Sequence, residues 1–70
     1  HLIKKDTGKT FVDLVTERRM EKACELLAHT TQRVGDIAAT VGFADEAYFT
    51  RRFRQRYRQT PTQFRRHAAA

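Results

Sequence analysis

The amino-acid sequence predicts an all-α fold in which several short helices pack as a small bundle. Three observations support this prediction: apolar residues recur at helical spacing, helix-capping residues precede those segments, and the chain has only one proline. Its 70 residues make one domain at most, and an apolar content of 40% is typical of a protein that folds. We therefore expect a single helical domain with a small core.

The first eight residues are predicted to end an element that begins before residue 1. The segment His-Leu-Ile-Lys-Lys resembles the last turn of a helix, because basic side chains favour the negative end of a helix. Gly8 then provides the left-handed residue that commonly ends helices. From this pattern we expect that earlier helices of the same domain precede the segment.

A long helix is predicted from residue 10 to residue 28. Thr10 is a candidate N-cap, and Asp13 takes the place of the capping-box carboxylate three residues later. A broad apolar arc runs along this helix. Its members are Phe11, Val12, Val15, Ala23, Leu26 and Leu27.

One charged residue, Arg19, interrupts that apolar arc. A charged group in such a position must be paired or must reach solvent by its aliphatic stem. We expect a buried ion pair, with Asp36 or Asp45 as the partner of Arg19.

A short amphipathic helix is predicted after a polar link at residues 29–33. Four apolar side chains recur there at i, i+3, i+4 and i+7, which is the spacing of one helix face. They are Val34, Ile37, Ala38 and Val41. Gly42 ends this helix, because glycine adopts the positive φ that reverses a chain without steric cost.

Two more helices are predicted from their capping residues. Asp45 caps a helix over residues 46–57. Thr60 caps a terminal helix over residues 61–67, in which proline occupies the first position and Phe64 points inward.

The two helices joined at Gly42 have the layout of a homeodomain-like helix-turn-helix, which we assign to residues 32–57. In that motif the first helix braces the second, and the second enters the major groove of DNA. The second helix has two unlike faces. One face holds Phe49, Phe53 and Tyr57 and is predicted to be core; the opposite face holds Ala47, Arg51, Arg54 and Arg58.

Charge is segregated along the chain. Residues 1–46 hold seven basic and eight acidic side chains, whereas residues 47–70 hold seven arginines and no acid. A helix face of uncompensated arginines repels itself unless an anion relieves the repulsion. Arginine also grips a phosphate or a guanine edge with two parallel hydrogen bonds. Double-stranded DNA is therefore the partner that this segment predicts.

With these residues in view, the sequence is similar to the DNA-binding region of the AraC/XylS family of bacterial transcription regulators. The first part resembles the family's linker helix in Gly8-Lys9-Thr10-Phe11, Arg19, Ala23 and Leu26-Leu27. The brace and turn of the family's second helix-turn-helix are matched by Asp36-Ile37-Ala38 and Gly42-Phe43. The signature is completed by Tyr48-Phe49, Phe53, Thr60-Pro61 and Phe64-Arg65.

This resemblance implies two helix-turn-helix units that a linker helix joins, usually beside a separate effector-binding or dimerisation domain. The two units read successive major-groove turns of a promoter. Residues 1–8 would end the first unit, residues 10–28 would be the linker helix, and only the second unit is complete. Ala47 is short where family members often carry a base-reading side chain. Arg58 stands where glycine is common, so it must adopt a left-handed conformation, at a cost of about 1 kcal/mol, or end the helix differently.

The second helix of the motif supplies most of the predicted DNA contacts. Arg51 is expected to read guanine, because it projects from the cationic face one turn after the helix start. Glu46 either accepts a hydrogen bond from a cytosine amino group or merely favours the positive end of its helix. The expected base-reading residues are Glu46, Ala47, Arg51 and Gln55. The expected phosphate contacts are Tyr48, Thr50, Arg54, Arg58 and Arg65.

Catalysis and metal binding are not predicted. The sequence shows no paired carboxylates in a plausible pocket, no Ser-His-Asp arrangement and no Gly-rich phosphate loop, so we expect no enzyme and no cofactor. His1, His29 and His67 are scattered, and Cys24 fits a small core residue better than a metal ligand. The alternative function is a basic helical module that binds an acidic protein or an anionic surface such as a membrane.

Double-stranded promoter DNA is the expected partner, with RNA polymerase as a further partner of the full-length protein and no membrane. One cysteine cannot form an internal disulfide, and nothing in the sequence resembles a signal peptide or a membrane span. We therefore expect a bacterial cytoplasmic protein that is associated with the nucleoid when bound. The isolated chain is expected to be monomeric.

Overall fold

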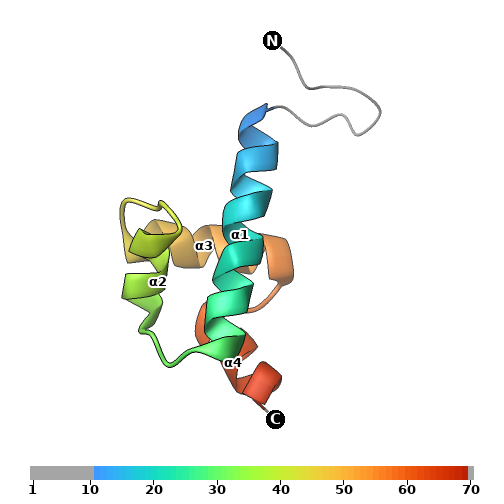
Figure 1. Cartoon of the computed structure of the whole chain (residues 1–70). Coiled ribbons are helices and arrows are strands. Elements are labelled where there is room, and N and C mark those ends of the chain that lie inside the picture. Colours follow the sequence, from blue (N-terminus) through green and yellow to red (C-terminus); the bar gives the residue numbers. More distant parts are fainter. Residues whose placement is uncertain (1–10, 70) are drawn as a thin grey trace.

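The computed structural model describes residues 11–69, which form four helices (Figure 1). The helices are α1 (Phe11–His29), α2 (Val34–Thr40), α3 (Glu46–Tyr57) and α4 (Pro61–Ala69). The described residues contain no strand, so the all-α prediction is confirmed, and each helix boundary lies within two residues of its predicted place. The helix end predicted in residues 1–8 and the Thr10 cap lie outside the described residues.

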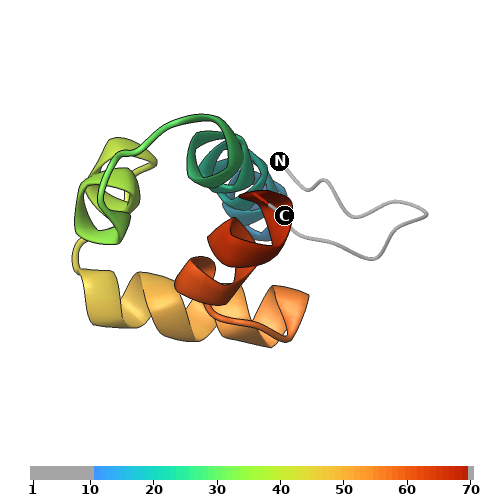
Figure 2. The same ribbon diagram turned by 90° about the horizontal axis from the view of Figure 1, so that it is seen from below.

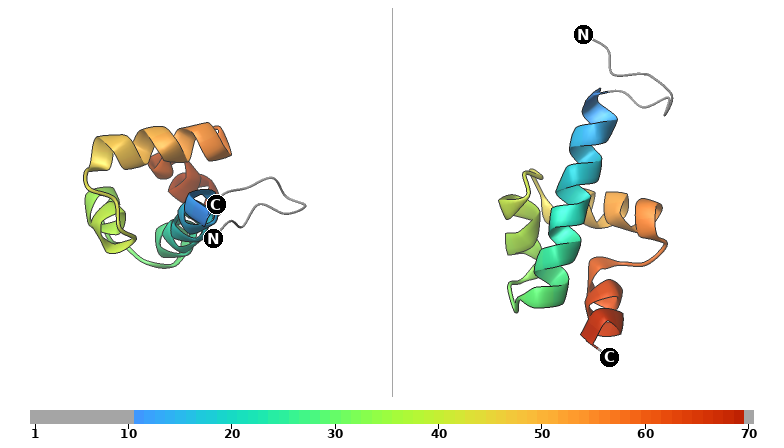
Figure 3. Two further views of the ribbon diagram at one scale, coloured as in Figure 1. Left: turned by 90° about the horizontal axis from the view of Figure 1, so that it is seen from above. Right: turned by 45° about the vertical axis from the view of Figure 1, so that its right-hand side comes forward.

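Helix α1 forms the long axis of the bundle, and the other three helices pack around its middle and C-terminal part (Figure 1). Helices α2 and α4 contact α1, and α3 contacts α2 and α4. Helix α3 runs along one edge of the bundle and crosses the direction of α1 steeply (Figure 2). The first turns of α1 extend beyond the other helices (Figure 3). This layout leaves one side of α3 facing outward.

The helices turn their apolar faces toward one core. It is formed by Met20, Ala23, Leu27, Ile37, Ala38, Val41, Phe43, Phe49 and Phe53. The ring centres of Phe49 and Phe53 lie 5.7 Å apart, and Phe53 meets Phe64 of α4 edge-on at the same distance, 5.7 Å. Tilted ring pairs of this kind add about 0.5–1.5 kcal/mol to the energy of burial. The predicted core face of α3 and the inward position of Phe64 are therefore confirmed.

The apolar face of α1 differs from the predicted arc at its first turn. Phe11 and Val12 are 61% and 68% exposed, although the helical spacing places them with the core residues. The physical reason is that the first turns of α1 extend past the other three described helices, so none of these covers them (Figure 1). Met20, which the predicted arc omits, is buried instead at 1% exposure.

Arg19 also has partners other than those predicted. Its exposed guanidinium donates a hydrogen bond to the carbonyl of Gly42 at 3.3 Å and lies 6.0 Å from the ring centre of Phe43. The predicted buried ion pair with Asp36 or Asp45 is therefore wrong. A carbonyl just past the end of a helix carries partial negative charge, so it can receive the cation without burial of a carboxylate.

The turn between α2 and α3 is a Schellman motif at Gly42, whose φ is 102°. The amide of Gly42 donates to the carbonyl of Ala39 at 3.1 Å, and the amide of Phe43 donates to that of Ala38 at 2.8 Å. These two bonds satisfy carbonyls at the end of α2 and turn the Phe43 ring into the core. The predicted glycine stop is confirmed, and it sets the direction in which α3 begins.

Side-chain caps begin both α3 and α4. The Asp45 carboxylate accepts from the amide of Tyr48 at 2.7 Å, as predicted. The Thr60 hydroxyl accepts from the amide of Gln63 at 3.1 Å, and the Gln63 side-chain oxygen accepts from the amide of Thr60 at 2.9 Å. This reciprocal pair is a capping box. The predicted Thr60 cap is thus confirmed, and Gln63 is a contributor that the sequence analysis missed.

Helix α3 ends at Arg58, which adopts the left-handed conformation with φ 62° and ψ 22°. Its amide donates to the carbonyl of Arg54 at 2.8 Å, which closes the last turn of the helix. The left-handed alternative predicted for this residue is confirmed. A residue with a Cβ is strained in that region by about 1–2 kcal/mol.

Arg58→Gly is expected to raise the free energy of unfolding by about 0.5–1 kcal/mol, because glycine relieves the strain but loses more backbone entropy on folding. The melting temperature should rise by about 2–8 °C for a domain of this size. Arg58→Ala is the matched control, since it removes the same charge and keeps the Cβ. Thermal unfolding followed by circular dichroism compares the three proteins. If Arg58→Gly melts no higher than Arg58→Ala, strain at this residue does not limit stability.

Candidate nucleic-acid interface

Burial of one side of α3 determines which side chains remain outside. Phe49 and Phe53 are fully buried and Tyr57 is half-buried, so these rings hold the helix in one rotation about its axis. The opposite side is exposed along the length of the helix. We call it the outer face of α3; it consists of Ala47, Arg51, Arg54, Gln55 and Arg58.

Arg51 lies against a stack of rings that begins in the core. The ring centre of Tyr48, whose side chain is 43% exposed, lies 5.9 Å from that of the buried Phe43. The guanidinium carbon of Arg51 lies 5.8 Å from the Tyr48 ring centre. A ring at this distance attracts a cation by about 0.5–1 kcal/mol at an exposed site. The stack therefore limits where the Arg51 side chain points without neutralising its charge.

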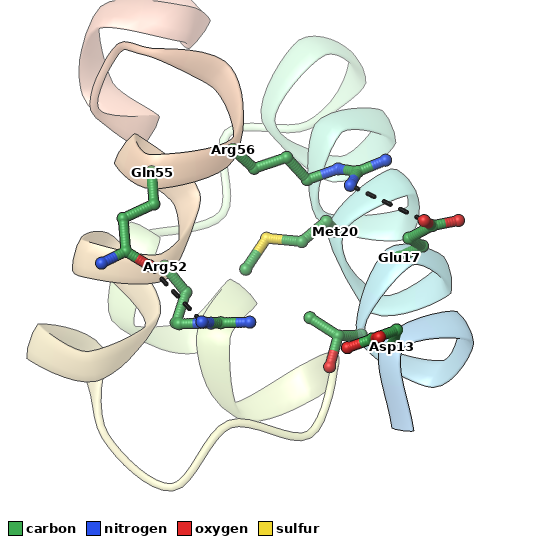
Figure 4. A pocket seen from close by; sticks show the side chains of 7 residues that line it. Asp13, Glu17, Met20, Arg52, Gln55 and Arg56 are labelled. Carbon is green, nitrogen blue, oxygen red and sulfur yellow. Dashed lines mark hydrogen bonds and ion pairs between the residues drawn. The ribbon is translucent and has the colours of Figure 1, made fainter. Parts of the chain in front are cut away.

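Two other arginines of α3 lie toward α1 rather than on the outer face (Figure 4). A guanidinium nitrogen of Arg56 lies 4.0 Å from the Glu17 carboxylate, and Arg52 donates to the side-chain oxygen of Gln55 at 3.4 Å. These residues, with Asp13, line a groove between the two helices. The side chains of Arg56 and Glu17 are 38% and 21% exposed, and an ion pair that is open to solvent contributes only about 0–1 kcal/mol to stability. Its consequence is that Arg56 lies beside an acid, unlike the arginines of the outer face.

Arg65 ties α4 to the end of α1. Its Nε donates to the carbonyl of Leu27 at 3.0 Å, and its Nη2 donates to the carbonyl of Thr30 at 3.1 Å. Carbonyls at the end of a helix lack partners within the helix and need such donors. Because the half-buried guanidinium is already engaged in this way, the geometry conflicts with the predicted phosphate contact. We leave Arg65 out of the candidate interface.

Arg65→Ala is expected to lower the free energy of unfolding by about 1–3 kcal/mol, because two helix-end carbonyls lose a charged donor. The DNA affinity of the folded protein should not change. Arg66→Ala is the control on the same helix, where an exposed arginine should matter by less than about 0.5 kcal/mol. Urea unfolding measures both variants. If Arg65→Ala has an unchanged unfolding midpoint but binds DNA more weakly, Arg65 contacts phosphate as the sequence predicts.

Glu46 lies on the α2 side of α3. A Cβ built on Gly35 would lie 2.8 Å from the Glu46 Oε1, so the carboxylate passes close over the first turn of α2. Its spacing from Phe49 and Phe53, at i+3 and i+7, places Glu46 on the same side of α3 as these core residues. The positive end of α2 favours a carboxylate there. The Glu46 carboxylate therefore lies close to α2, and the contact of this residue with a cytosine stays a prediction.

A hollow opens beside Ala47 on the outward side of α3. Its lining atoms are mainly apolar. The hollow is lined by Glu46, Ala47, Thr50, Arg51, Arg54, Gln55 and Thr60, the N-cap of α4. Six of the residues predicted to contact DNA thus line one depression.

The structure brings most of the other predicted contacts to the same side of the molecule. Tyr48 is exposed beside the outer face, and Thr50 is half-buried on the wall of the hollow. Gln55, Arg54 and Arg58 are exposed on the outer face itself. Of the other residues that the sequence assigned to DNA, Glu46 lines the hollow but has its carboxylate close to α2, and Arg65 hydrogen-bonds to the end of α1.

Cys24 is half-buried and packs against the core. Burial raises the pKa of its thiol, and a hydrogen bond with Tyr57 lowers it by less. Burial likewise raises the pKa of the Tyr57 hydroxyl, whereas its hydrogen bond with Arg56 lowers it. A thiol with a raised pKa stays protonated near neutral pH and is a poor nucleophile or metal ligand. The contacts of Cys24 agree with the small core residue that the sequence predicts.

Metal ligands do not converge in the part of the chain that the structure describes. No three His, Cys, Asp or Glu side chains of residues 11–69 lie together as a metal ion would require. Among the same residues, no helix combines the length and the apolar character that crossing a membrane demands.

Comparisons with known proteins agree with this interpretation. Residues 1–67 match the family model described as a helix-turn-helix domain. The regulatory protein PocR of Salmonella typhimurium is 41% identical over 64 residues, which cover 91% of this chain and 21% of PocR. The transcriptional activator RhaR of Pectobacterium carotovorum is 39% identical over 62 residues, which cover 89% of this chain and 22% of RhaR. The chain thus spans about a fifth of the length of these relatives.

Solved structures share the fold. The C-terminal domain of the response regulator yesN from Fusobacterium nucleatum superposes with a TM-score of 0.83 at 44% identity, over 89% of this chain and 60% of that one. A Chromobacterium violaceum transcriptional regulator, described as having an AraC-type DNA-binding domain, gives a TM-score of 0.90 at 26% identity. That match covers 94% of this chain and 59% of the other.

Proposed function

This chain belongs to the AraC-type helix-turn-helix family, and from that premise we propose that α3 is its recognition helix, with the outer face lying in the major groove of a promoter. The chain is a sequence-specific DNA-binding module of a transcription regulator. In the proposed complex α2 braces α3 through the turn at Gly42, and the core rings hold the outer face toward the DNA.

The observation that carries this proposal is a row of arginines with no acid among them. Arg51, Arg54 and Arg58 are exposed on the outer face, and none of the five residues of that face is acidic. Glu46, the acid of α3, is turned toward α2. Such a face repels itself, and DNA phosphates relieve that repulsion. Because α3 runs along an edge of the bundle (Figure 2), it can approach a groove about 12 Å wide.

Within this interface the residues have two kinds of role. A recognition helix reads bases with the side chains that face the groove floor and holds the backbone with those at its flanks. We assign base reading to Ala47, Arg51 and Gln55. We assign phosphate contact to Tyr48, Thr50, Arg54 and Arg58.

The rest of the protein's action is inferred from its relatives, of which the chain spans about a fifth. We propose that residues 32–57 are the second helix-turn-helix of such a regulator and that residues 10–28 are the linker helix that follows the first. Since the relative RhaR is named as an activator, we propose that the whole protein activates transcription together with RNA polymerase. The proposed place of action is the bacterial cytoplasm, at the nucleoid. We also propose that the isolated chain is a monomer and has no enzymatic activity.

Selection of bound sequences from a random duplex pool tests the proposed function directly. The chain is expected to enrich one consensus, because base-edge contacts discriminate each position by about 1–3 kcal/mol. A module that binds anionic surfaces would enrich no consensus and would prefer the densest polyanion, such as heparin. That result would contradict sequence-specific binding through α3.

Arg54→Ala is expected to weaken binding to every duplex by one factor and to flatten the slope of log K against log salt by about one, because a phosphate contact carries no sequence information. Anisotropy titrations at several salt concentrations measure that slope. Arg18→Ala is the control, since Arg18 is also exposed but belongs to α1. An altered base preference at one position, with the slope intact, would instead make Arg54 a base-reading residue.

A further inference from the structure

We propose that the hollow beside Ala47 receives the methyl group of a thymine, so that Ala47 selects the base pair next to the one that Arg51 reads. The proposal rests on the proposed function, because it assigns one kind of base to part of the outer face of α3. Its ligand is the 5-methyl group on the major-groove edge of a T·A pair.

The hollow lies where a base edge would arrive. Ala47 is exposed in the first turn of α3, and Arg51 and Arg54 follow it at i+4 and i+7, on the same stripe of the helix. All three line the hollow. The two cations draw DNA toward this stripe, and the short side chain at its start lets the base edge come close. A larger side chain in place of Ala47 would fill the space.

The Ala47 side chain offers nothing to a polar base edge, although Thr50, Gln55 and Thr60 also line the hollow. The lining atoms are mainly apolar, and the Ala47 side chain can neither donate nor accept a hydrogen bond. The nearest acid, Glu46, has its carboxylate over the first turn of α2, where a Cβ on Gly35 would lie 2.8 Å from it. An amino group of adenine or cytosine placed directly over Ala47 would gain no hydrogen bond from that side chain.

Thymine is the base that suits such a lining. It alone presents a methyl group in the major groove, and an alanine side chain can contact that methyl without any hydrogen bond. The contact removes apolar surface from water, which is favourable in itself. Successive turns of a recognition helix face neighbouring base pairs, so the thymine belongs to the pair beside the guanine expected for Arg51.

Replacement of thymine by deoxyuridine tests the contact, because deoxyuridine lacks only the methyl group. The duplex is the consensus selected by the 70-residue chain, and its thymines are replaced one at a time. At one position the dissociation constant is expected to rise about three- to fivefold, the value of one buried methyl group. Replacement of the other thymines should change the dissociation constant little, unless the methyl group that is removed contacts another apolar side chain.

Two glycine variants locate the partner of that methyl group. In Ala47→Gly the sensitive deoxyuridine replacement should no longer weaken binding, because the hollow has lost the group that the methyl touches. Ala39→Gly is the matched control: it also removes an exposed alanine methyl from a helix, but from α2, so the deoxyuridine effect should persist. Circular dichroism checks that both variants are folded. If Ala47→Gly does not fold, Ala47→Ser replaces it, and its hydroxyl should likewise reduce the effect.

The possible outcomes distinguish failure of the thymine contact from failure of the proposed function. If the consensus keeps its base preferences but no thymine is sensitive to loss of its methyl, the proposal is overturned and the proposed function stands. A sensitive thymine whose effect persists in Ala47→Gly, or in Ala47→Ser, also overturns it, since another residue then receives the methyl group. If no consensus is selected at all, the proposed function itself fails.

Discussion

Phe53→Ala is expected to lower the free energy of unfolding by about 3–5 kcal/mol, the cost of emptying the site of a fully buried phenylalanine. Phe53 is 0% exposed, and its ring centre lies 4.6 Å from that of Tyr57 and 5.7 Å from those of Phe49 and Phe64. The lost ring therefore leaves a cavity where α3 meets α4. A domain of this size has only about 4–10 kcal/mol of stability, so the variant should be near or below its limit of folding at 25 °C.

Urea unfolding followed by far-UV circular dichroism measures the change. Tyr48→Ala is the control, because its ring lies on the same helix but is 43% exposed, and it should cost about 1 kcal/mol or less. Phe53→Ala with an unfolding midpoint near that of the original chain would mean that this side of α3 does not face the core. The outer face would then be assigned to the wrong side of the helix, and the DNA contacts with it.

The helix boundaries could be predicted because the interactions that define them are local. Asp45 caps the amide three residues ahead, and Thr60 and Gln63 cap each other across the same distance. Gly42 ends α2 with bonds that reach back only three to five residues. Such contacts depend on residue type and spacing within one turn, so a sequence displays them before any tertiary structure is known.

The partners of long cationic side chains could not be predicted in this way. Arg65 reaches the carbonyl of Leu27 across 38 residues, and Arg19 reaches that of Gly42 across 23. Each arginine has many rotamers and each helix end offers several unpaired carbonyls, so the sequence defines neither partner. The expectation of a buried ion pair for Arg19 was wrong because it assumed that a charge needs an opposite charge, although a carbonyl suffices.

The candidate site was predictable as a face but not in its details. Helical periodicity separates Phe49 and Phe53 from the arginines opposite them, and the structure keeps that separation. The same periodicity places Glu46 on the side of Phe49 and Phe53, but it does not show that this residue is exposed and lines the hollow beside Ala47. The ring contact of Tyr48 with Phe43 could not be found by periodicity, because Phe43 comes from the turn and not from the helix.

Arg51→Ala is expected to cost about 1–3 kcal/mol of binding free energy and to relax the base preference at one base pair, with guanine as the base that loses its advantage. Arg51 is exposed on the outer face one turn after the start of α3, and the Tyr48 ring lies 5.8 Å from its guanidinium. A side chain limited in this way loses less entropy when it forms two hydrogen bonds to a guanine edge. Binding of each single-base variant of the selected site, at one salt concentration, measures the preference.

Arg56→Ala is the matched control for that measurement, because it removes the same charge from the same helix and its guanidinium lies beside the Glu17 carboxylate of α1. It should weaken binding little and leave every base preference in place. A second comparison, Arg51→Lys, keeps the charge but cannot make the paired hydrogen bonds, so most of the lost discrimination should remain lost. If Arg51→Ala instead lowers the affinity for all variants by one factor and leaves their ranking unchanged, Arg51 holds only phosphate, and the base reading of α3 must be assigned to other side chains of its outer face.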